Sequence, residues 1–134
     1  MAQIIEKLKS IPNLYHAKGC STSQIKAAQD ILGIIFPDEF VEYVKQFGAI
    51  SFYGTEWTGL NVDGYLNVVE ATLQERKFNT SFPNDCIVLE NLGIDGLLTV
   101  MNAEGEIFSI HYDKRDKVCG SLVEYVDVCK SRKK

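Results

Sequence analysis

The chain has 134 residues, the usual size of one domain, and its 46% apolar and 24% charged content matches the globular average, which excludes wholesale disorder. No apolar run approaches the roughly 18 residues that would cross a membrane. The N-terminus carries charges inside its apolar pattern, unlike a secretory leader. We therefore expect a single domain over residues 1–134 that stays in the cytoplasm.

The net charge of −4 is unevenly spread along the chain. Residues 36–106 hold twelve acidic residues against three basic ones, which are Lys45, Arg76 and Lys77, whereas both flanking segments are net positive. Binding to a phosphate backbone needs clustered Lys and Arg, so this acidic middle disfavours nucleic acid and favours a basic partner. The alternative is that the acidity serves only solubility.

The N-terminal third predicts three helices. Apolar residues recur at helical spacing over residues 4–11, where a proline then ends the pattern. Ser21 and Gln24 form a capping box that opens a second helix, and Gly33 closes it. A third helix is expected over residues 37–48, because proline is favoured in a first helical turn and a glycine ends the segment.

Alternation of period two then predicts strands in the middle of the chain. The expected elements are strands over 49–53 and 57–61, a helix over 66–77, a strand over 86–90, a hairpin over 97–102 and 106–111, and a final helix opened by Ser121 and Glu124. Together they predict an α+β domain with N-terminal helices, a small and mostly antiparallel sheet, and a C-terminal helix.

The four cysteines do not indicate a metal site. There is no C-x-x-C pair among Cys20, Cys86, Cys119 and Cys129. His16 lies four residues before Cys20, but the segment between them has the composition of a loop. An even count allows two disulfides, but without a secretory leader we expect reduced thiols. Neither a metal nor a cofactor is predicted.

The sequence offers little that could carry catalysis. His111 and Asp113 share one face of an expected strand, yet no G-x-S-x-G turn or phosphate-binding glycine loop accompanies them. We predict no catalytic residue and regard the chain as a binding protein rather than an enzyme. A small enzyme that uses His111 and Asp113 remains the alternative to test.

One segment has the composition of a contact surface. Residues 51–60 contain the only tryptophan and place Tyr53, Glu56 and Trp57 around Gly54. Trp and Tyr provide large contact area at low entropic cost, which is why they dominate protein interfaces. For Trp57, burial in the core of a small sheet is an equally good reading.

The order of these motifs resembles the SUKH superfamily, which is also known for yeast cell-wall assembly regulators. The resemblance spans nearly the whole chain. It departs from the family pattern at Phe36, where Leu is usual, and at Gly48, where a doubled glycine is common. The motifs that carry it are Leu32-Gly33, the helix that opens with Phe36-Pro37, Phe47-Gly48, the turn over 92–96, and Ser121-Leu122-Val123-Glu124.

The resemblance implies a bacterial immunity protein that binds a toxin domain, often a nuclease, and neutralises it by occlusion. It implies a basic protein as partner, with no direct contact to nucleic acid or membrane, and a monomer or weak dimer. A scaffolding module in cell-wall or signalling control is the runner-up. The contact residues we predict are Tyr53, Glu56, Trp57 and Asp63, with Glu70, Asp85, Glu90 and Asp95 as further candidates.

Overall fold

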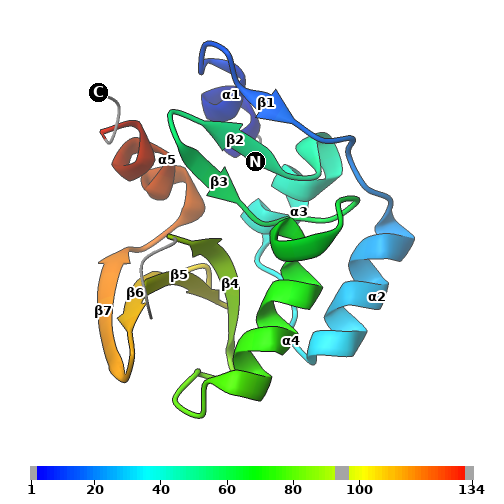
Figure 1. Cartoon of the computed structure of the whole chain (residues 1–134). Helices are drawn as coiled ribbons and strands as arrows, with labels where there is room; N and C mark the ends of the chain where they lie inside the picture. Colours follow the sequence, from blue (N-terminus) through cyan, green and yellow to red (C-terminus); the bar gives the residue numbers. More distant parts are fainter. Residues whose placement is uncertain (1–2, 93–96, 132–134) are drawn as a thin grey trace.

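The N-terminal part of the computed structural model, which describes residues 3–92 and 97–131, is helical (Figure 1). Its helices are α1 (Gln3–Lys9), α2 (Thr22–Leu32) and α3 (Asp38–Phe47), so all three predicted helices are confirmed. The capping box of α2 is complete: Gln24 donates its backbone N–H to Ser21 Oγ at 3.1 Å, and Ser21 donates its own to Gln24 Oε1 at 2.8 Å. Gly33 ends the helix in the left-handed region, as the sequence indicates.

Two small antiparallel sheets follow in place of one. The first has the order β1 (Tyr15–His16), β2 (Ile50–Phe52), β3 (Thr55–Trp57). The second has the order β4 (Cys86–Asn91), β5 (Leu97–Asn102), β6 (Ile107–His111), β7 (Lys114–Cys119). The α+β class is confirmed, and the predicted hairpin forms β5 and β6. The two-residue β1 and the polar β7 were not predicted, because neither shows an apolar alternation.

Residues 58–61 are not part of a strand, contrary to the prediction. Thr58 instead joins the two sheets, since its N–H donates to Leu89 O at 2.8 Å and its hydroxyl donates to Val88 O at 2.7 Å. The hydroxyl of Thr72 in helix α4 (Val68–Phe78) accepts the N–H of Val88 at 3.0 Å. These contacts cover the outer edge of β4, which would otherwise expose backbone groups ready to pair with another chain.

The main core lies between the helices and one face of the larger sheet. Trp57 is at its centre: its ring stacks on Tyr125 at 6.0 Å between centroids and meets the edges of Tyr43 and Phe52. The Tyr43 hydroxyl donates to Thr58 O at 2.7 Å, so this buried phenol is satisfied. A smaller cluster fills the opposite face of the sheet, beneath α4.

Three segments cross backbone to backbone at glycines. A Cβ on Gly59 would lie 1.7 Å from Gly48 O, and one on Gly48 would lie 2.2 Å from Lys18 O. Leu60 donates its N–H to Gly48 O at 2.9 Å, which closes the crossing. Only glycine allows this approach. The crossing fixes where the loop after Gly59 leaves the core, and that loop forms the site described below.

Helix α5 (Leu122–Lys130) is capped from two directions. Ser121 Oγ accepts the N–H of Glu124 at 3.2 Å, as predicted, but the Glu124 side chain reaches Gly120 rather than Ser121. Glu39 of α3 supplies the second cap, because its carboxylate accepts the N–H of Leu122 at 2.8 Å. The predicted inward face of α5 is confirmed, with Leu122, Tyr125, Val126 and Cys129 buried.

Strand β7 forms the outer edge of the larger sheet (Figure 1). Its residues Lys114 to Val118 are exposed, and four of those five are charged. Lys117 pairs with Glu106 at 3.0 Å, and Arg115 lies over the Phe108 ring at 4.2 Å. None of the helices in the described ranges is long and apolar enough to cross a membrane.

Candidate functional site

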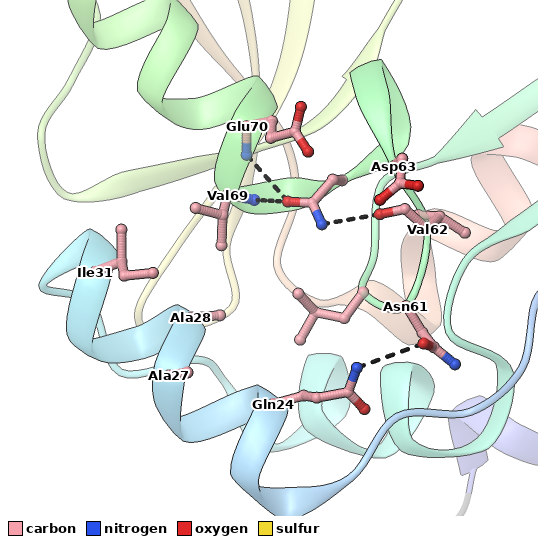
Figure 2. A pocket seen from close by; sticks show the side chains of 11 residues that line it. Gln24, Ala27, Ala28, Ile31, Asn61, Val62, Asp63, Val69 and Glu70 are labelled. Carbon is pink, nitrogen blue, oxygen red and sulfur yellow. Dashed lines mark hydrogen bonds between the residues drawn. The ribbon is translucent and has the colours of Figure 1, made fainter.

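The loop that leaves the glycine crossing carries a hollow on each side. The loop contains the short 3-10 helix η1 (Gly64–Leu66) and ends at α4. On one side it faces α2 across a groove of about 550 Å³ (Figure 2). On the other side it faces the β2–β3 turn and the end of β4 across a hollow of about 390 Å³. We call the exposed area over both hollows the η1 surface, defined by Ile31, Glu56, Asp63, Tyr65 and Glu70.

Asn67 holds the loop and the start of α4 together. Its Oδ1 accepts the N–H groups of Val69 at 2.9 Å and Glu70 at 3.0 Å, which caps the helix, and its Nδ2 donates to Val62 O at 2.9 Å (Figure 2). Asn61 anchors the other end of the loop, because its amide donates to Lys18 O at 3.2 Å. The groove is therefore built on fixed backbone.

The groove combines apolar walls with carboxylates. Ile31 of α2 is 58% exposed and lines the wall opposite Asp63 and Glu70, which come from the loop and from the first turn of α4 (Figure 2). Within residues 3–92 and 97–131, no Lys or Arg forms an ion pair with either carboxylate. The groove can thus take a segment that offers both apolar and cationic groups.

The second hollow contains an aromatic side chain and a carboxylate that are hydrogen-bonded to each other. Tyr65 is 63% exposed and donates its hydroxyl to Glu56 Oε1 at 2.9 Å. This hydrogen bond, together with the charge of Glu56, raises the pKa of the Tyr65 phenol above its usual value. The phenol is protonated at neutral pH and keeps Glu56 as an acceptor.

Tyr53 occupies the tight turn between β2 and β3, beside the second hollow. Its φ is 50° and that of Gly54 is 80°, so both central residues of the two-residue turn are left-handed. A bulky side chain rarely adopts this conformation, and turns of this shape favour Asn-Gly or Gly-Gly. The Tyr53 ring meets Phe52 edge-on at 5.7 Å between centroids, which holds the strained residue in place.

Two predicted contact residues are buried instead. Trp57 is 0% exposed, so the core reading is correct and its placement on a contact surface is wrong. Glu90 is 2% exposed, and its carboxylate accepts the hydroxyl of Tyr125, which also contacts Thr99 Oγ1 at 3.1 Å. Burial, and secondly the charge of Glu90, raises the pKa of Tyr125. Both faces of β4 are covered, so the alternation of residues along the strand does not distinguish exposed from buried positions. The sequence alone therefore could not show that Glu90 is buried.

The remaining predicted residues lie apart from this surface or outside the described residues. Asp85 precedes β4 and lies 3.9 Å from Arg115 of β7. Asp95 lies outside the residues that the structure describes. The structure therefore places Asp63 and Glu70 together at the groove and Glu56 at the second hollow, with Tyr53 in the adjoining turn.

Sequence reasoning missed two members of the η1 surface. Ile31 breaks the inward pattern of α2, in which Ile25, Ala28 and Leu32 are buried, so its position on the outer face could have been noticed. Tyr65 follows an Asp-Gly turn and offered no periodicity to interpret. Its distance from Glu56 along the chain hid the hydrogen bond between them.

The alternative catalytic pair finds little support in the geometry. His111 lies exposed at the end of β6, and its ring contacts Tyr112 at 4.6 Å between centroids. In the described part of the chain, no group of three or more His, Cys, Asp or Glu side chains is arranged to hold a metal ion.

Comparison with known proteins assigns the chain to a family. A search of curated proteins finds no match. A family model described as SMI1-KNR4 cell-wall (SUKH_5) matches residues 1–129, which is nearly the whole chain. The resemblance noted from the motifs is thereby confirmed, and the chain belongs to the SUKH family, which includes immunity proteins.

Proposed function

We propose that this protein is an immunity protein that neutralises a toxin domain by covering its active or substrate-binding surface. Membership of a family that includes immunity proteins is the observation that carries the proposal. The η1 surface supports it, because this surface combines an exposed aromatic, an exposed aliphatic side chain and three carboxylates on a fixed backbone.

The charge of this surface suits a basic partner. Nuclease domains bind phosphates and are therefore often basic, so an acidic inhibitor is drawn towards the cleft that it must block. Asp63 and Glu70 speed the encounter, whereas the lifetime of the complex depends on the apolar and aromatic contacts made by Ile31 and Tyr65. No chemical step is required of the immunity protein.

The test is to co-express this protein with the C-terminal domain of a toxin-like protein that an adjacent gene encodes. We expect rescue of growth and co-purification of a one-to-one complex. Changing Asp63 and Glu70 to Lys is expected to abolish both, whereas changing Glu104 and Asp116 to Lys, an equal change of charge at exposed positions of the larger sheet and its turns, leaves both intact. Equal loss in the two double variants would show that net charge matters rather than the η1 surface.

Two other outcomes would replace the proposal. Rescue without a complex would indicate enzymatic detoxification and would return attention to His111. Neither rescue nor a complex would favour the second candidate function, a scaffolding module. The cell-wall description of the matching family model is the observation that supports this candidate.

A further inference from the structure

Tyr65 and Glu56 form the most specific feature of the η1 surface. We propose that this pair receives an arginine side chain of the partner protein, with the guanidinium stacked on the Tyr65 ring and hydrogen-bonded to the Glu56 carboxylate. The inference rests on the proposed function for the partner being a basic protein, and it adds which basic side chain is recognised and where.

The hydrogen bond between the two residues prepares them for such a ligand. Tyr65 is 63% exposed, yet its hydroxyl is tied to Glu56 Oε1 at 2.9 Å, so the ring is accessible and already oriented. Less side-chain freedom is then lost on binding. A carboxylate has about four acceptor positions, and the Tyr65 hydroxyl uses one of them.

The charges around the pair also favour a cation. No Lys or Arg in the described ranges forms an ion pair with Glu56. The hollow beside it measures about 390 Å³ and is lined by Gly54, Glu90, Asn91 and Leu92 in addition to the pair, although the Glu90 carboxylate itself is buried against Tyr125. It offers room for an extended side chain, and none of the described residues that line it carries a positive charge that would repel a cation.

The shape of the pair selects arginine over lysine. A guanidinium is planar, so it can lie flat on an aromatic ring while its edge donates to a carboxylate. An ammonium is a compact, strongly hydrated charge that can approach the ring or the carboxylate but does not match both at once. The adjoining groove, with Ile31 on its wall, would take apolar residues that flank the arginine.

The test uses the full chain, labelled with ¹⁵N, titrated with hexa-arginine and separately with hexa-lysine while amide shifts are recorded. We expect saturable shifts centred on Gly54, Glu56 and Tyr65, with hexa-arginine binding more tightly. Tyr65→Ala should weaken hexa-arginine binding about 2- to 5-fold, the range of an exposed cation–π contact. Tyr65→Phe should retain most of the affinity, because the ring remains.

Tyr112→Ala is the matched control, since Tyr112 is 52% exposed in a tight turn elsewhere and its loss should leave hexa-arginine binding unchanged. Circular dichroism verifies that each variant is folded. Shifts centred on Asp38 and Glu42, two carboxylates of α3 that line a separate hollow, would overturn the inference. Equal binding of the two peptides, or unchanged affinity in Tyr65→Ala, would overturn it as well. A toxin complex whose affinity is unchanged in Tyr65→Ala would leave the immunity function standing while rejecting the arginine contact.

Discussion

Replacing Trp57 by alanine separates a core residue from a contact residue. The side chain is 0% exposed and contacts the rings of Tyr43, Phe52 and Tyr125, so truncation removes its transfer free energy and leaves a cavity. Such Trp→Ala changes cost about 3–5 kcal/mol. This is a large part of the roughly 5–15 kcal/mol by which a domain is stable.

The assay is urea unfolding followed by far-UV circular dichroism, because the variant lacks the only tryptophan. With a slope of about 1.5 kcal/mol per molar urea, the midpoint should fall by about 2–3 M. Trp57→Phe should cost far less, since the Trp57 Nε1 has no hydrogen-bond partner among the described residues and its removal relieves a buried donor. If the urea midpoint of Trp57→Ala decreases by less than about 1 M, the central packing of this ring is refuted.

Three further predictions concern the glycine crossing, the N-terminal cap of α4 and the stability of the fold at acid pH. Gly59→Ala should destabilise the fold by more than about 3 kcal/mol, because the added Cβ would lie 1.7 Å from a backbone oxygen. Gly54→Ala should cost only about 1–2 kcal/mol, because Gly54 has open space around it and only its φ of 80° is unfavourable for alanine. Urea unfolding measures both free energies. Asn67→Ala should cost about 1 kcal/mol through loss of the α4 cap and should shift the amide resonances of the groove; equal amide spectra would contradict that role. The hydrogen bond from Asn102, and then that from Lys117, lowers the pKa of Glu106. The stabilisation that the ionised Glu106 gives the fold is therefore complete above the unfolded-state pKa of about 4.3, and it is lost as the pH falls through the lower pKa of the folded state. Glu106→Gln should therefore flatten the dependence of the free energy of unfolding on pH below about pH 4.5.

The helices were predictable because their signals are local. The capping box at Ser21, the left-handed Gly33 and the apolar face of α5 each depend on residues within a few positions of one another. The strand over 57–61 failed for the opposite reason. Thr58 bonds to Leu89 and Val88, some thirty residues away, and no alternation within the segment could reveal that connection.

The exposure of the predicted contact residues could be inferred from the sequence only in part, for the same reason. Composition drew attention to acidic and aromatic residues, among them Glu56, Asp63 and Glu70, which the structure exposes. It could not distinguish Trp57, which faces the core, from Tyr65, which faces solvent. That distinction depends on how α3 and α5 enclose β3, which is a property of the tertiary packing.

The charged outer strand β7 has a consequence for the behaviour of the protein in a crowded cell. Lysine and arginine on an open sheet edge discourage another strand from adding to it. Strand β7 is therefore protected against edge-to-edge self-association, and neutral residues at Lys114 and Lys117 should promote aggregation of the chain in concentrated solution.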